Sequence, residues 1–220
     1  MLDSNWELIN GPAAHHIEQL NAANTINVLE ALVTFLINFN QPGQLPHVPN
    51  EAAFKELHRT GTLFLLVAPG AYRDGPVHIA NMSTGEVVYQ PPPHEDVQGL
   101  MDAFFEELHH IWRVGDALDA AAFALWRVNW IHPFKNGNGR TARAFAYACL
   151  NARLGVMLPG TTTVIDQIMM TRPDYEAAIR VADKAAATDP NARDLQQMKD
   201  YLDRLLQIQI NSIPDAGSGA

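Results

Sequence analysis

A turn-forming segment from His132 to Arg143 divides the second half of the chain, because apolar helical patterns lead up to it and away from it. Pro133 ends the first helix, since proline disfavours helical geometry in the preceding residue and has no N–H to donate. The run Gly137-Asn138-Gly139 tolerates left-handed backbone angles, so its N–H groups can converge at the start of the next helix. Unpaired N–H groups and the helix dipole attract an anion there. The segment therefore predicts an anion-binding loop between two helices.

Three side chains beside this loop suit phosphate chemistry. Arg140 and Arg143 are three positions apart, so both fall on one face of the first helical turn. Guanidinium groups bind phosphate oxygens through directed, charge-assisted hydrogen bonds. His132, at the entrance to the loop, is the side chain there that can accept a proton near neutral pH. These residues predict a phosphate cradle with a candidate base at its rim.

The same segment resembles the signature of the Fic (Fic/Doc) family, His-x-Phe-x-Asp/Glu-Gly-Asn-Gly-Arg-x-x-Arg. Every defined position matches except the acidic one, which is Asn136. The family's enzymes are mostly adenylyltransferases, which move AMP from ATP onto a hydroxyl group of a target protein. The resemblance extends over roughly residues 60 to 190. It implies a mainly α-helical, Fic-like bundle with a small β-hairpin flap.

The resemblance also implies a role for each residue of the loop. His132 would be the general base that takes the proton from a Ser, Thr or Tyr hydroxyl of the target. Arg140 and Arg143 would grip the outer phosphates of ATP, which leave as pyrophosphate. We expect Phe134 to anchor the loop in the core without a chemical part. The backbone of the loop and one amide side chain would bind the phosphates; these residues are Gly137, Asn138 and Gly139.

Asn136 is the one departure from the motif. In active members a carboxylate here binds the Mg²⁺ that bridges the phosphates, whereas an amide offers one neutral oxygen, so Mg²⁺ affinity should fall. Three alternatives stay open. The chain is a slower adenylyltransferase with a weakened Mg²⁺ site; or it transfers a different phosphate-containing group, as in Doc-like phosphorylation; or it is a nucleotide- or protein-binding module that has lost turnover. We favour the enzyme.

A small hairpin is predicted upstream, where two alternating segments flank Ser83-Thr84-Gly85. In the family this hairpin is the flap, which holds the target peptide beside the active site. Pairing with an exposed strand edge would align a target without demanding much of its sequence. The predicted docking residues are Val77, His78, Ile79, Val87 and Val88. The alternative is a hairpin that merely covers one end of the helical bundle.

Many Fic proteins are restrained by a helix bearing Ser/Thr-x-x-x-Glu-Gly/Asn, whose glutamate pairs with the second motif arginine, here Arg143. Thr25 and Thr171 are each followed by a glutamate one position too late for this motif. We therefore expect either inhibition by a separate small partner protein or no restraint of this kind.

Helical patterns fill most of the remaining chain, which predicts one domain over residues 1–213 with its core at about 60–190. Helices near both ends, at about 14–39 and 192–210, should pack on that core. Residues 214–220 are expected to form a mobile tail.

Two further expectations concern the first third of the chain. The apolar run 63–67 fits either a helix or a buried strand. The expected apolar positions of the first helix are Ile17, Leu20, Val28, Leu32, Phe35, Leu36 and Phe39.

The net charge of −9 argues against general binding to nucleic acid or to anionic membranes. No charged-then-apolar leader opens the sequence, and we expect no apolar run of membrane-spanning length. These features favour a cytoplasmic protein, and a protein delivered by a dedicated secretion machine would share them.

Overall fold

The computed structural model describes residues 7–39, 44–81, 83–188 and 193–213. Within these ranges the protein has eight α-helices and one antiparallel two-stranded hairpin, which confirms the predicted fold class. The helices are α1 (Gly11–Asn38), α2 (Glu51–Thr62), α3 (Val97–Val114), α4 (Ala117–Ile131), α5 (Asn138–Leu154), α6 (Val164–Met170), α7 (Arg172–Thr188) and α8 (Gln196–Asn211). The strands are β1 (Ile79–Ala80) and β2 (Val87–Tyr89), and a short 3₁₀ turn, His94–Asp96, precedes α3.

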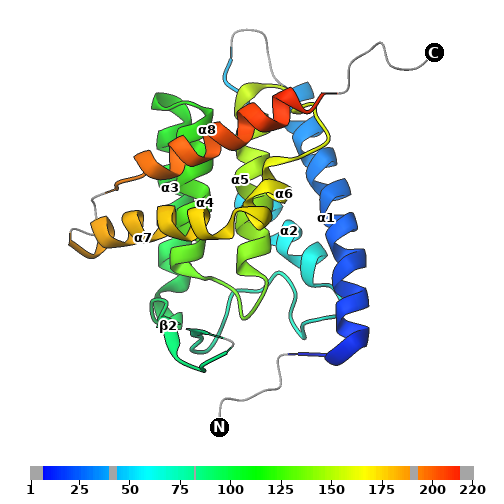
Figure 1. Ribbon diagram of the computed structural model, residues 1–220, viewed down its shortest axis with the longest axis vertical. Coiled ribbons are helices and arrows are strands. Elements are labelled where there is room, and N and C mark those ends of the chain that lie inside the picture. Colours follow the sequence, from blue (N-terminus) through cyan, green and yellow to red (C-terminus); the bar gives the residue numbers. More distant parts are fainter. Residues whose placement is uncertain (1–6, 40–43, 82, 189–192, 214–220) are drawn as a thin grey trace.

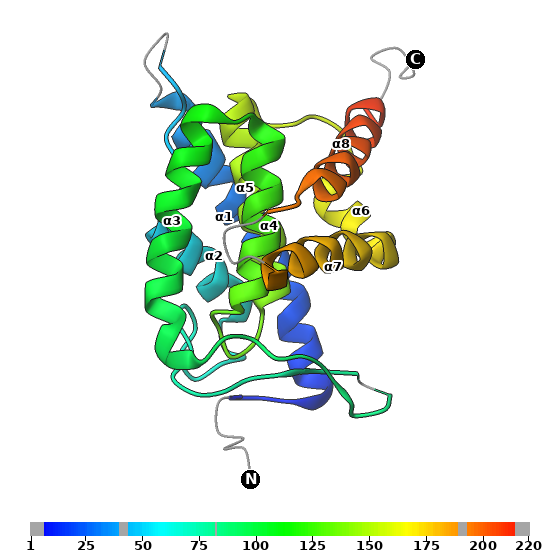
Figure 2. The ribbon, with the colours of Figure 1, turned by 90° about the vertical axis from the view of Figure 1, so that its left-hand side faces the viewer.

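Helices α4 and α5 form the centre of the molecule and pack along each other (Figure 1). Both are buried on nearly every side, and both are rich in alanine, which lets their backbones approach closely. Helix α3 lies against α4 and α1 lies against α5, while α7 and α8 cross the bundle at a steep angle (Figure 2). The hairpin and the loop between α4 and α5 lie at the same end of the bundle (Figures 1 and 2).

Local sequence signals explain where the central helices begin and end. Asp116 and Asp119 form a reciprocal capping box at the start of α4. His132 follows the last residue of α4 in a left-handed conformation, and Gly137 precedes α5 in the same region, with φ of +79°. Gly155 ends α5, again with positive φ. The predicted anion-binding loop between Ile131 and Asn138, called the anion loop below, thus lies between two helices with well-defined ends.

The apolar positions predicted for the first helix are confirmed in part: Leu36 is buried, and Ile17, Val28 and Leu32 are half-buried. Leu29 and Val33 are buried, whereas Leu20, Phe35 and Phe39 are each more than half exposed, so the prediction is wrong at these three positions. Apolar residues occur around much of α1, and for such a helix the sequence pattern does not single out one buried stripe.

The expectation that no apolar run reaches membrane-spanning length is also wrong. Helix α1 is long and apolar enough to cross a membrane, by length and composition alone. Those criteria are weak for a single helix, because a core helix meets them too. In this structure α1 packs against α2 and α5.

The run 63–67 is neither helix nor strand. Helix α2 ends at Thr62, and Phe64 then adopts a φ of +62° in a turn. The amide of Asn21 donates to the Leu63 carbonyl at 2.8 Å, which fixes this turn against α1. Leu66 makes one isolated β-bridge with Glu7.

At the C-terminal end, α8 begins later than predicted and packs on α4, α6 and α7. The predicted start at position 192 and the predicted tail at 214–220 lie outside the described residues.

Candidate active site

His132 sits at the junction between α4 and the anion loop with φ of +53° and ψ of +58°. For a residue with a side chain this left-handed conformation costs about 1–2 kcal/mol, so the surroundings must impose it. Three hydrogen bonds do so. The His132 N–H donates to the Val128 carbonyl at 2.9 Å, the Arg73 Nε donates to the His132 carbonyl at 2.9 Å, and the Arg73 N–H donates to the Pro133 carbonyl at 2.8 Å.

The partly buried position of His132 keeps its imidazole neutral. Burial lowers the pKa of His132 to about 4, the backbone of Asn129 acts in the opposite direction, and the positive charge of Arg73 lowers the pKa further. Its buried Nδ1 has no hydrogen-bond partner in the described part of the chain. At neutral pH the ring therefore has a lone pair with which to accept a proton.

Two residues that the sequence did not single out tie the hairpin to this junction. The guanidinium of Arg73 is almost fully buried and donates to the carbonyls of His132, Gly75 and Pro92 rather than to a carboxylate. The hydroxyl of Tyr89 in β2 donates to the Trp130 carbonyl of α4 at 2.6 Å. The segment that precedes the hairpin, through Arg73, and strand β2, through Tyr89, are thus both hydrogen-bonded to the segment that carries His132.

Asn138 faces into the protein, which corrects the prediction that its side chain binds phosphate. Its Oδ1 accepts from the Phe134 N–H at 2.8 Å, and its Nδ2 donates to the Phe134 carbonyl at 2.8 Å. Both polar ends of the amide are therefore used to hold the loop closed, and the backbone N–H of Asn138 stays the candidate phosphate donor. Phe134 itself is fully buried, as expected of an anchor.

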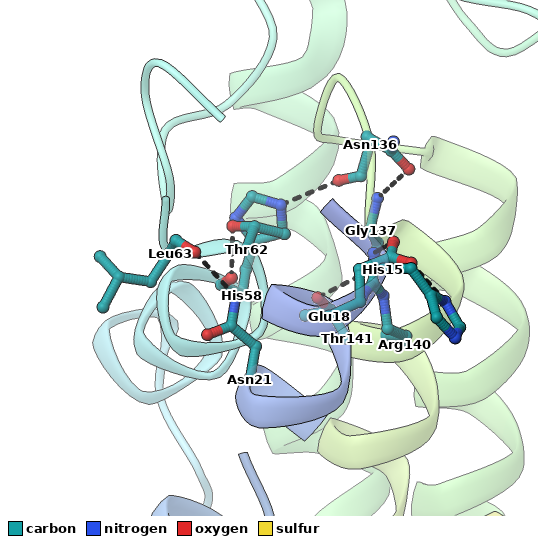
Figure 3. A network of polar contacts seen from close by, with 10 residues as sticks. All are labelled: His15, Glu18, Asn21, His58, Thr62, Leu63, Asn136, Gly137, Arg140 and Thr141. Atoms are coloured by element: carbon teal, nitrogen blue, oxygen red, sulfur yellow. Dashed lines mark hydrogen bonds and ion pairs between the residues drawn. The ribbon is translucent and has the colours of Figure 1, made fainter. Parts of the chain in front are cut away.

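Gly137 immediately precedes α5, in a place that only glycine fits. A Cβ there would lie 2.7 Å from the Cγ2 atom of Thr62, and its φ is positive. Its N–H donates to the Oδ1 atom of Asn136 at 2.6 Å, as Figure 3 shows. The side chain of Asn136 thus occupies one of the amide donors predicted to bind phosphate. Gly139, in the first turn of α5, lies beside Arg143.

The residues around Asn136 do not form a magnesium site by themselves. Asn136 contributes one neutral oxygen that already accepts a hydrogen bond, and no three His, Cys, Asp or Glu side chains cluster to hold a metal in the described ranges. The neighbouring charge of Lys135 is paired with Asp74 at 2.6 Å.

The two arginines near the start of α5, Arg140 and Arg143, have contrasting surroundings. Arg140 is partly exposed and pairs with Glu18 of α1 at 3.1 Å (Figure 3). Arg143 is half-buried, makes no ion pair in the described part of the chain, and has a buried Nε without an acceptor there. Burial lowers the pKa of Arg143 while the nearby Tyr175 raises it. A buried guanidinium without a counter-ion is costly, so an anion that reached it would be stabilised.

The predicted docking residues of the hairpin are mostly accessible. Val87 and Val88 of β2 and Ile79 of β1 are exposed, and the register pairs Ile79 with Tyr89. His78 is exposed and Val77 half-buried, and both precede β1. The hairpin thus presents apolar side chains at the end of the bundle that holds His132.

Comparison with known proteins places these features in a wider context. Residues 49–150 match the model of the Fic/DOC family. The fold resembles that of a Fic domain containing signaling protein from Bacteroides thetaiotaomicron, with a TM-score of 0.64 and 20% identity over 93% of this chain and 72% of that one. A Fic family protein from Desulfovibrio desulfuricans gives a TM-score of 0.60 and 19% identity, over 91% of this chain and 66% of that one. Fic-1 from C. elegans (residues 134–508) gives 0.63 and 22%, over 96% of this chain but 54% of that chain, of which this protein spans about half.

Proposed function

We propose that this protein moves AMP from ATP onto a hydroxyl group of a target protein, on the premise that residues 49–150, which match the model of the Fic/DOC family, form a domain of this family of nucleotidyltransferases. The target docks on the hairpin, and Mg²⁺ enters with ATP as part of the substrate. At these levels of identity, likeness to the solved structures supports the fold alone, so the activity is argued from the site.

One observation carries the proposal: Arg143, which is half-buried and has no counter-ion among the described residues, lies in the second turn of α5, and the start of this helix is only a short loop away from the neutral His132. Helix starts and guanidinium groups bind phosphate, and a neutral imidazole accepts protons. Together they provide the two requirements of nucleotidyl transfer to an alcohol, which are an aligned, neutralised phosphate chain and a base for the hydroxyl proton.

The reaction balances with these groups alone. The hydroxyl oxygen of the target forms a bond to the α-phosphorus while the bond from that phosphorus to the bridging oxygen of pyrophosphate breaks. The proton of the hydroxyl passes to the unprotonated ring nitrogen of His132. Arg140 and Arg143 hold the leaving pyrophosphate, and Mg²⁺, when bound with ATP, neutralises part of its charge.

A second candidate function rests on Asn136. Its Oδ1 accepts from the Gly137 N–H at 2.6 Å, so an internal group fills a position that an anion would use. A protein of this kind would bind a nucleotide or a partner without turnover. The absence of a carboxylate at position 136 also favours this second function.

Intact-mass measurement of the protein and of lysate proteins, after incubation with ATP and Mg²⁺, separates these candidates. Addition of AMP supports the proposed transfer. Addition of phosphate alone would replace it with a phosphorylation reaction. Binding of ATP in calorimetry with no covalent addition would replace it with the binding module.

A further inference from the structure

His58 of α2 lies beneath the anion loop and is fully buried. Its ring stacks on the ring of Phe134, with 3.6 Å between the centroids and 6° between the planes. Both ring nitrogens are engaged. The Gly70 N–H donates to Nδ1 at 2.8 Å, and Nε2 lies 2.9 Å from the Asn136 carbonyl oxygen, a contact drawn in Figure 3.

These partners fix the protonation state of the ring. A backbone N–H can only donate, so Nδ1 carries the lone pair, and a carbonyl oxygen can only accept, so Nε2 carries the hydrogen. His58 is therefore one neutral tautomer, in keeping with a pKa that burial lowers to about 4. A ring that merely filled space would not require this pattern of one acceptor and one donor.

The two partners of His58 belong to different parts of the site. Gly70 begins the turn that leads through Arg73 into the hairpin, and a side chain there is disfavoured, because the φ of Gly70 is +86° and a Cβ would lie 3.2 Å from the Lys55 carbonyl oxygen. Asn136 is the residue whose own side chain accepts from the Gly137 N–H. His58 thus joins the approach to the hairpin to the phosphate-facing part of the loop.

We propose that His58 is a positioning residue: its Nε2–H···O=C bond to Asn136 sets the orientation of the anion loop for nucleotide binding, while its bond from Gly70 sets the approach to the flap. The proposal rests on the proposed function, since it takes the nucleotide to be the ligand of this loop. It concerns binding and alignment, and His58 itself does not touch the reacting atoms.

Substitutions at position 58 can separate the two bonds from the packing of the ring. His58→Phe keeps a flat ring against Phe134 and removes both bonds. In His58→Gln the terminal amide reaches the position of Nε2 and can still donate to the Asn136 carbonyl. In His58→Asn the shorter amide reaches the position of Nδ1 and can still accept from the Gly70 N–H.

The experiment measures ATP binding to the full-length chain by calorimetry, together with hydrogen exchange of the amides at 136–139 in the absence of ligand. We expect ATP affinity to fall about tenfold in His58→Phe and in His58→Asn, the factor for a loss of about 1.4 kcal/mol, and to fall less than threefold in His58→Gln. The loop amides should exchange faster in the first two variants and at the original rate in the third.

A core truncation in the second half of α3, Leu108→Ala, serves as the matched control, since it should lower Tm without changing ATP affinity or loop exchange. Equal affinities in the wild type, the Phe variant and the Asn variant would overturn the proposal. So would losses that simply follow Tm in all variants, the control included. If His58→Phe does not fold, the difference between the Gln and Asn variants decides.

The two proposals can fail separately. A wild-type protein that binds ATP and transfers nothing would contradict the proposed reaction and leave the His58 comparison intact. If the wild type does not bind ATP at all, loop exchange in the free protein still tests the positioning role, and equal exchange rates in the three variants would reject it.

Discussion

Glu18 and Arg140 form an ion pair of 3.1 Å although 122 residues separate them in the sequence. The carboxylate comes from α1 and the guanidinium from the first turn of α5, so the N-terminal helix holds one of the two arginines proposed to bind phosphate. Both side chains are partly exposed, and such pairs contribute about 0–1 kcal/mol. A nucleotide whose phosphates bind Arg140 must displace the Glu18 carboxylate from this ion pair.

Replacing Glu18 with glutamine should therefore strengthen ATP binding modestly, by about two- to fivefold, because Arg140 no longer has to leave a carboxylate. Calorimetry at low ionic strength measures the change. Glu30→Gln provides a matched control, because it removes the same charge from the same helix at an exposed position for which no ion pair is seen within the described residues. Equal gains in both variants would mean that the overall charge of α1, and not the pair, sets the affinity.

His132→Asn should lower the rate of transfer by about 10²–10⁴-fold while ATP affinity stays within about twofold. Asparagine tolerates the left-handed backbone of this position better than alanine does, but its amide does not act as a base near neutral pH. Label transfer and calorimetry on the same preparation give both quantities. A parallel loss of binding and transfer would show that His132 supports the site structurally instead of accepting the proton.

Asn136→Asp should raise the rate of transfer and make it depend more steeply on Mg²⁺ concentration. The carboxylate adds an anionic oxygen for the metal carried by ATP. Asn136→Ala removes the oxygen altogether and so isolates its contribution, and transfer at graded Mg²⁺ concentrations compares the three proteins. Unchanged transfer in the Asp variant would reject a weak metal interaction as the limit on activity.

The stability of the protein should fall as pH drops from about 6.5 to about 4, partly because of His58. Its pKa is about 4 in the folded state and near 6.5 when unfolded, so in this range the unfolded chain binds a proton that the folded chain does not. The difference corresponds to at most about 3 kcal/mol, complete at pH 4 and absent above pH 7. Urea unfolding of the wild type and of His58→Phe across this range should show a smaller loss in the variant. An identical dependence of the unfolding free energy on pH in the two proteins would contradict a buried His58 that stays neutral in the folded state.

Much of the fold follows from local signals in the sequence. The helix stop at Pro133 and the glycine-led start of α5 each act through neighbouring backbone atoms, and the structure contains both where they were predicted. The hairpin around Ser83-Thr84-Gly85 is likewise a local feature. Local chemistry was sufficient at these places because the residues that decide the outcome are adjacent.

Most of the features that the sequence did not indicate depend on tertiary contacts, and the contact of Asn138 with Phe134 is the local exception. The inward turn of Asn138 could not be read from its motif, since the same amide can face a ligand or its own loop. The pairing of Glu18 with Arg140 joins distant segments, and the exposure of Phe35 depends on which side of α1 meets α5. The partners of His58 lie 12 and 78 residues away, so no spacing in the sequence signals its position beneath the loop.

The most direct test of the proposed reaction is the intact mass of candidate target proteins, and of the protein itself, after incubation with MgATP, with His132→Asn run in parallel. The account predicts that the wild type adds AMP to a hydroxyl side chain and releases pyrophosphate, and that the variant binds ATP but adds nothing. Addition of phosphate in place of AMP, or equal AMP addition by the wild type and the variant, would contradict it.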